Sequence, residues 1–107
     1  MGMEVGIWKA RTIKAFENED WYNSEQVEEV YYARKFYDLI QMASFIKNED
    51  EGEFIRLTKN QVEELIVIAT HNEDYWGGFD SVPMLCKILR DFDDDEERGY
   101  HYYLNFG

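Results

Sequence analysis

Apolar residues at helical spacing predict a long helix in the first half of the chain. The segment Asn23–Gln26 supplies an Asn or Ser that can cap a helix, with a Glu or Gln that can reach back to it. Apolar residues then recur at intervals typical of one helix face. The pattern predicts a helix over residues 24–47 that stops in the polar, charged cluster before Gly52. Its apolar positions are Val27, Val30, Tyr31, Tyr37, Ile40 and Ala43.

A strand that runs directly into a second helix is the clearest local pattern. Residues Glu53–Leu57 alternate in polarity and include β-prone side chains, so they predict a short strand. Thr58 and Gln61 have the spacing of a capping box, which predicts that a helix begins just after Thr58. Its apolar face is formed by Val62, Leu65, Ile66 and Ala69.

The last third of the chain predicts one more helix and one more strand. Asp80–Pro83 is typical of a helix start, since Pro is tolerated in a first turn. The helix is expected to end near Asp91, and Arg98-Gly99 predicts a turn. Tyr100–Phe106 is rich in aromatic residues and predicts a strand that pairs with residues 53–57. The buried face of the helix is expected to contain Met84, Leu85, Ile88, Leu89 and, close to them, Cys86.

The first twenty residues fit two interpretations. Trp8, Ile13 and Phe16 fit a short helix over residues 7–17, whereas Val5–Trp8 also fits an edge strand. We favour the helix. With either interpretation the chain is predicted to be a single α+β domain, residues 1–107, with three to four helices packed on a small antiparallel sheet. The segment is locally basic through Lys9, Arg11 and Lys14, for which we expect an electrostatic match with acidic residues of the same chain rather than an anionic ligand site.

The charge of the chain narrows the classes of partner. It carries 23 acidic and 11 basic residues, and six of the seven residues from Asp91 to Glu97 are carboxylates. Its aromatic fraction of 17% argues for a folded domain with an acidic surface rather than a disordered tail. Such a surface repels nucleic-acid phosphates and anionic membranes, so we expect neither as a direct partner. It attracts a basic protein surface instead.

Two further features predict a cytoplasmic protein. The longest apolar run, Leu65–Ala69, is far shorter than a membrane span, and the N-terminus lacks the apolar region of a signal peptide. The single cysteine, Cys86, cannot form an internal disulfide, in agreement with a reducing compartment.

No arrangement of residues predicts a metal site, a cofactor or catalysis. Asp91, Asp93 and Asp95 have the spacing of the first half of a calcium-binding loop, but Glu96 stands where that loop needs Gly, and Tyr102 where it needs Glu. We therefore expect a solvated acidic loop without a metal or cofactor. The remaining ligand types, His71, His101 and Cys86, are not paired as in zinc sites, so we expect no enzyme.

The segment Tyr75-Trp76-Gly77-Gly78-Phe79 places three aromatic residues around two glycines. Such a loop either folds back onto the core, which we favour, or exposes an anchor for a protein partner. Together with the acidic run it completes the candidate binding residues, which are Asp91, Asp93, Asp94, Asp95, Glu96, Glu97, Tyr75, Trp76 and Phe79.

Two segments carry a resemblance to known proteins. Trp8-Lys9 followed by a predicted helix, and the run Gly52–Leu65 (GEFIRLTKNQVEEL), are similar to small uncharacterised proteins encoded by bacteriophages and prophages. In those proteins an aromatic and basic N-terminal segment precedes a Gly-Glu strand that runs into a capped helix. The chain departs from that pattern in its acidic run and in the long helix predicted over residues 24–47. The resemblance implies a fold motif and no site residue.

These observations lead to two functional hypotheses. The first is a non-enzymatic accessory or host-modulating factor of phage type that docks a basic protein partner; a specific version is a DNA mimic whose carboxylates imitate phosphates. The alternative is a divalent-metal-binding module, or a metal-dependent enzyme, that uses residues 91–97. The oligomeric state is not determined by the sequence.

Overall fold

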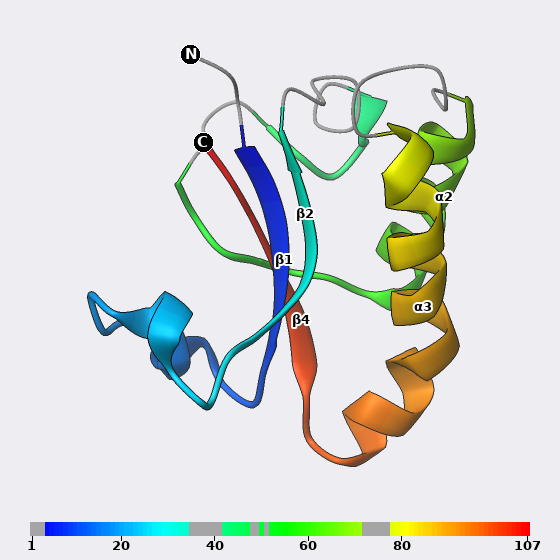
Figure 1. The fold of residues 1–107 in the computed structure, drawn as a ribbon. Helices are drawn as coiled ribbons and strands as arrows, with labels where there is room; N and C mark the ends of the chain where they lie inside the picture. Colours follow the sequence, from blue (N-terminus) through cyan, green and yellow to red (C-terminus); the bar gives the residue numbers. More distant parts are fainter. Residues whose placement is uncertain (1–3, 35–41, 48–49, 51, 72–77) are drawn as a thin grey trace.

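The computed structural model shows an α+β fold in which two helices pack on one face of a four-stranded antiparallel sheet (Figure 1). It describes residues 4–34, 42–47, 50, 52–71 and 78–107, and of residues 34 and 78–80 it describes the backbone alone. The strand order in the sheet is β2-β1-β4-β3. The strands are β1 (Glu4–Ala10), β2 (Glu28–Arg34), β3 (Ile55–Arg56) and β4 (His101–Phe106); the helices are α2 (Lys59–His71) and α3 (Gly78–Glu97), with two 3-10 turns, η1 (Ile13–Phe16) and η2 (Trp21–Asn23).

The strand-to-helix junction forms as the sequence predicts. The Thr58 hydroxyl accepts a hydrogen bond from the Gln61 backbone N–H at 3.2 Å, and the Gln61 side chain accepts one from the Thr58 N–H at 2.9 Å. This reciprocal pair is a capping box. The predicted antiparallel pairing of the two C-terminal strands is also confirmed, with Ile55 opposite Leu104.

Both helices predicted in the first half of the chain are wrong within the described residues. Residues 7–10 of the predicted helix 7–17 belong to β1, and η1 follows them. Residues 28–34 of the predicted helix 24–47 form β2, and its residues 35–41 lie outside the described part of the chain. The Ser24 hydroxyl accepts from the Gln26 N–H at 3.1 Å and so closes a local turn instead of capping a helix.

The third predicted helix is longer than expected at both ends. It begins at Gly78 rather than Asp80 and runs through the acidic residues to Glu97, so the predicted acidic loop is a helix. The described residues thus contain two α-helices, not three or four. α3 stops because Gly99 adopts a left-handed φ of 89°; the N–H groups of Gly99 and Tyr100 bond back to the carbonyls of Glu96 and Asp95. This is a Schellman motif.

The sheet has a hydrophobic core on each face. The helix face is mainly aliphatic and includes Ile7, Leu65, Leu85 and Leu104, each 0% exposed. The opposite face is aromatic: Phe16 stacks on Phe54 with ring centroids 4.3 Å apart. The rings that surround this pair are Trp8, Trp21 and Tyr103.

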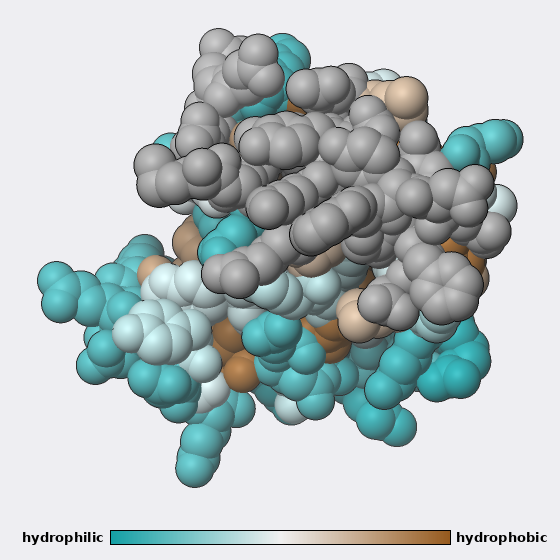
Figure 2. Space-filling view, turned by 45° about the horizontal axis from the view of Figure 1, so that its top comes forward, coloured by the Kyte–Doolittle hydropathy of each residue, from teal (hydrophilic) through white to brown (hydrophobic). Residues whose placement is uncertain are grey.

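Two residues predicted for the buried face of α3 lie on its surface instead, because Met84 and Cys86 are exposed. In the view of Figure 2 the described surface is largely hydrophilic, with small hydrophobic patches between polar side chains. None of the helices in the described part of the chain combines the length and the apolar run needed to cross a bilayer.

Candidate functional site

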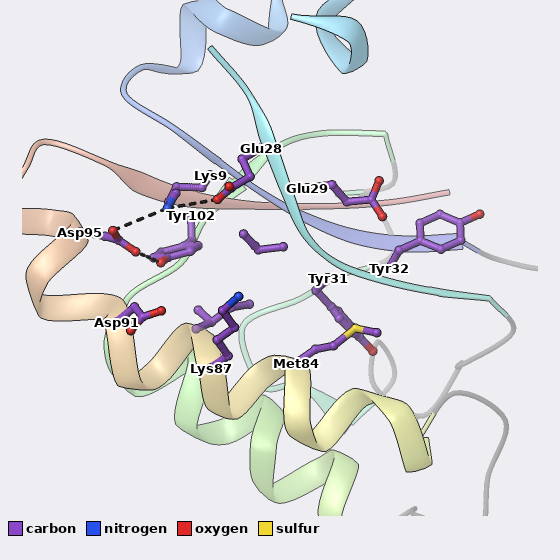
Figure 3. A pocket seen from close by; sticks show the side chains of 12 residues that line it. Lys9, Glu28, Glu29, Tyr31, Tyr32, Met84, Lys87, Asp91, Asp95 and Tyr102 are labelled. Carbon is purple, nitrogen blue, oxygen red and sulfur yellow. Dashed lines mark hydrogen bonds and ion pairs between the residues drawn. The ribbon is translucent and has the colours of Figure 1, made fainter. Parts of the chain in front are cut away.

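A cavity of about 500 Å³ lies between β2 and α3 (Figure 3). Its floor is apolar and comes from both elements, through Val30, Tyr31, Met84 and Ile88. Its polar lining comprises four carboxylates and two lysines, which are Glu28, Glu29, Asp91, Asp95, Lys9 and Lys87; Tyr32 and Tyr102 complete the lining.

A network of charged and polar groups closes one end of the cavity. The Tyr102 hydroxyl donates a hydrogen bond to the Asp95 carboxylate, and the Lys9 ammonium lies 3.6 Å from the same carboxylate. Lys9 also forms an ion pair with Glu28 at 3.1 Å. The Asp95 side chain is only 10% exposed, whereas that of Glu28 is 64% exposed. Figure 3 shows the four side chains converging from β1, β2, β4 and α3.

The sheet register explains why these groups meet. Lys9 on β1 is paired with Tyr102 of β4 on one side and with Glu28 of β2 on the other, so all three side chains share the helix face. The Schellman motif at Gly99 then turns the chain from α3 directly into β4. This turn holds the Asp95 end of α3 over the strands.

Burial and charge shift the pKa values of several groups around the cavity. Burial raises the pKa of Tyr102 far above its ordinary value, and the hydrogen bond to Asp95 raises it further. Burial opposes protonation of Lys9, but the carboxylates of Glu28 and Asp95 outweigh it, so the pKa of Lys9 is raised. The hydrogen bond from Arg90 holds the pKa of Asp91 below its ordinary value.

A second buried hydrogen bond ties the other end of α3 to β2. The hydroxyl oxygens of Tyr31 and Ser81 are 2.6 Å apart, and both residues are buried. Burial raises the pKa of Tyr31 to about 12, against a smaller opposite effect of the hydrogen bond to Ser81. α3 is therefore fixed to the sheet near both of its ends by a polar contact.

The residues of the predicted acidic site lie on different sides of α3 and therefore have different surroundings. Asp91 and Asp95 line the cavity. Asp93 lies away from it and pairs with Lys59 at 2.8 Å. The remaining three, Asp94, Glu96 and Glu97, are exposed to solvent.

Helical geometry also removes the loop on which the calcium-site comparison was based, because alternate residues of a helix point to opposite sides. In the described parts of the chain, no group of three or more His, Cys, Asp or Glu residues is arranged to hold a metal ion. His71 lies in the last turn of α2. His101, on β4, has a lowered pKa, caused first by burial and then by the charge of Arg56.

The predicted aromatic anchor cannot be compared with the structure. Tyr75 and Trp76 lie outside the described residues, and of Phe79 only the backbone, within α3, is described. A different aromatic hollow, of about 440 Å³, opens on the aromatic face over Gly6. Trp8 lies across Gly6 so closely that a Cβ there would come within 2.1 Å of its ring, which explains the glycine.

Most residues of the cavity are not among the candidate site residues that the sequence predicts. The predicted N-terminal helix contains Lys9, although the alternation Val5, Ile7, Lys9 is typical of one face of a strand. The helix predicted over residues 24–47 contains Glu28 and Glu29, and so gives no sign of their position on an edge strand. The expectation that the basic N-terminal residues match acidic residues of the same chain is confirmed for Lys9.

Comparison of the chain with protein-family models, with curated proteins and with solved structures finds no match. Function therefore has to be inferred from the chemistry of the chain's own residues.

Proposed function

We propose that the protein is a non-enzymatic binding protein that docks a basic segment of another protein in the cavity between β2 and α3. The observation that carries this proposal is the lining itself: an apolar floor bordered by four carboxylates and two lysines. One lysine, Lys9, is already neutralised by Glu28 and Asp95. Long Lys and Arg side chains suit such a site, because their stems cover apolar surface while their charged ends reach carboxylates.

The charge of the whole chain supports the same class of partner. A formal net charge of −12 attracts a basic surface and speeds its encounter with the protein. Asp91 and Glu29 are the carboxylates of the cavity that do not contact Lys9 within the described ion pairs. They lie on α3 and β2 respectively, so each of the two elements that border the cavity carries such a carboxylate.

The position of the acidic run in α3 gives a second, independent argument. The C-terminal end of a helix carries a partial negative charge, so carboxylates there oppose the helix dipole. The last turn of α3 contains acidic residues and no basic one. Only Asp95 of this turn lines the cavity, and the other carboxylates add negative charge beside it, which attracts a basic partner.

A selection from a random peptide library displayed on phage tests the proposal. We expect the enriched peptides to be rich in Lys and Arg and their affinity, measured by fluorescence anisotropy, to fall with added salt. The matched variants are a cavity triple, Glu28→Gln/Glu29→Gln/Asp91→Asn, and a control triple, Glu17→Gln/Glu19→Gln/Asp20→Asn, which removes the same charge from exposed positions near η1 and η2.

Loss of affinity in the cavity triple alone supports docking in the cavity. Equal loss in both triples means that only the overall charge matters, and enrichment of uncharged or acidic peptides contradicts the proposal. The DNA-mimic version, the phage-type role and the metal-binding alternative stay predictions from the sequence, and calcium or manganese titration by calorimetry tests the last of them.

A further inference from the structure

The outer edge of β2 is open in the described part of the chain. β2 pairs with β1 on one side, and among the described residues no strand pairs with its other side. An edge strand presents a row of unpaired N–H and C=O groups that another chain can use. The opposite edge, β3, has only two residues, whereas β2 has seven. β2 is therefore the edge strand beside which another strand can pair.

The cavity runs along this edge rather than along one face of the strand. Its lining includes five consecutive residues of β2, from Glu28 to Tyr32. Side chains of a strand alternate between its faces, apart from a bulge at Val30 between the pairs Tyr31–Ile7 and Glu29–Trp8, so a hollow that meets all five residues lies beside the strand. Figure 3 shows Tyr31 pointing from β2 toward α3 and Tyr32 pointing away from it.

The surroundings of the edge define the chemistry of a segment that would pair there. Glu28 faces the helices beside Lys9, and Glu29 lies at the next position of the strand, opposite Trp8. A strand added beside β2 would therefore meet a carboxylate on each of its faces. Opposite charges on neighbouring strands are favourable, and like charges are not, so the added strand should carry Lys or Arg.

We propose that β2 accepts an extended, lysine- or arginine-bearing segment of a partner protein as a fifth strand of the sheet, with alternate side chains entering the cavity beside α3. This inference rests on the proposed function and adds to it the binding mode. Main-chain hydrogen bonds supply affinity in such complexes, and the pockets for alternate side chains supply specificity. Met84, exposed and flexible, can adapt the cavity floor to side chains of different length.

Two capped octapeptides of equal charge and composition test the binding mode. One alternates lysine and threonine, and the other carries the same residues in two blocks. We expect the alternating peptide to bind at least about tenfold more tightly, since a difference of this size corresponds to little more than one good contact. Hydrogen exchange should slow in β2 when it binds, and N-methylation of every second peptide residue should abolish binding in one register and spare it in the other.

The outcomes distinguish strand addition at β2 from the docking of a basic segment in general. Equal affinities for the two peptides, with unchanged exchange in β2 and with loss of binding in the cavity triple, leave basic docking intact and overturn strand addition. Binding of neither octapeptide also overturns strand addition, because the alternating peptide presents the chemistry that it requires. The selection from the peptide library tests the docking function independently of the binding mode.

Discussion

The two faces of the sheet are packed with different chemistry, although the same strands supply both. The aromatic face is closed by rings: Phe16 contacts Trp21, Phe54 and Tyr103 at centroid distances of 4.3 to 5.4 Å. The core of the helix face is mainly aliphatic, and this face also holds buried polar groups near both ends of α3. The alternation is visible within β1, where Val5, Ile7 and Lys9 face the helices and Gly6, Trp8 and Ala10 face the rings.

The two kinds of packing differ in how they respond to pH and to the loss of a partner group. Apolar packing contributes to stability on both faces and depends little on pH. Buried polar groups are stable only while their partners are present, so they respond to protonation and to the loss of a partner. On the described surface, the helix face combines such groups with a cavity, and it is therefore where binding and pH dependence should concentrate.

The largest expected effect is loss of the fold at alkaline pH, arising from the helix face. The pKa values of Tyr31, Tyr102 and Lys9 are all raised in the folded state. The unfolded chain therefore releases these protons first, and the stability that these three groups contribute is complete below about pH 10 and falls as the pH rises above it. A tyrosine whose pKa rises to about 12 contributes about 3 kcal/mol to this loss.

Tyrosinate absorbance followed together with circular dichroism checks this expectation. Two tyrosines should ionise only as the protein unfolds. Tyr31→Phe removes one of these groups, so the free energy of unfolding should fall less between neutral and alkaline pH than it does in the parent. Tyr22→Phe, at an exposed site, serves as the control. Ionisation of all tyrosines before any unfolding would contradict the buried hydrogen bonds of Tyr31 and Tyr102.

Removal of a large side chain from each core compares the two faces directly. Leu65→Ala on the helix face should cost about 2 to 5 kcal/mol, and Phe16→Ala on the aromatic face about 3 to 5 kcal/mol. Both residues are almost fully buried. Urea unfolding measures both changes. If Phe16→Ala costs less than about 1 kcal/mol, the aromatic face is a peripheral attachment rather than a second core.

The network at Lys9 should show a smaller, coupled effect. Lys9→Met leaves the Asp95 carboxylate buried without its ammonium partner, and we expect a loss of about 2 kcal/mol, below the range for fully buried pairs because Glu28 is exposed. Adding Asp95→Asn removes the uncompensated charge and should recover part of the loss. Additive costs in this double-mutant cycle, again from urea unfolding, would mean that the two groups do not interact.

Signals that lie within a few residues of one another could be read from the sequence. The capping box at Thr58 and the turn at Gly99 act through local hydrogen bonds, and both were predicted. The strand assignment in the first half failed because it depends on distant partners. Lys9 is paired with Tyr102, at the other end of the chain, and no local window contains that pairing. The segment Glu28–Arg34 has adjacent apolar residues that fit a helix face equally well.

The candidate site divides in the same way. The acidic run was evident from composition, but the sequence could not tell which carboxylate is buried. Asp95 is distinguished from Asp94 by the helix rotation and by the Tyr102 hydroxyl above it. The cavity itself needs β2 beside α3, a juxtaposition of segments that are about fifty residues apart, as in the bond between Tyr31 and Ser81.

Thr58→Ala should produce a moderate effect that is independent of the two faces. It removes the hydroxyl that accepts from the Gln61 N–H and should cost about 1 kcal/mol. Thr58→Ser keeps this bond and serves as the control. In urea unfolding the cost should stay below that of Leu65→Ala. The reverse order would show that the start of α2 matters more than its buried face.

The smallest expected effect per substitution concerns the exposed carboxylates at the end of α3 and has the opposite sign. Asp94→Asn/Glu96→Gln/Glu97→Gln removes charges that oppose the helix dipole, and should stabilise the protein by about 0.3 to 1 kcal/mol per group at low salt. Asp95 is left in place because Tyr102 and Lys9 hold it. The control triple near η1 and η2 changes the net charge equally and should give only the smaller gain from relief of general repulsion.

The salt dependence of this pair of variants completes the comparison. Added salt should reduce the difference between the helix-end triple and the control, because both sets of charges are exposed and therefore screened. Affinity for the selected basic peptides should fall less in the helix-end triple than in the cavity triple, since Asp94, Glu96 and Glu97 do not line the cavity. A helix-end triple that is less stable than the parent would show that these carboxylates support the fold. Their position at this end of α3 would then be explained by stability and not by attraction of a basic partner.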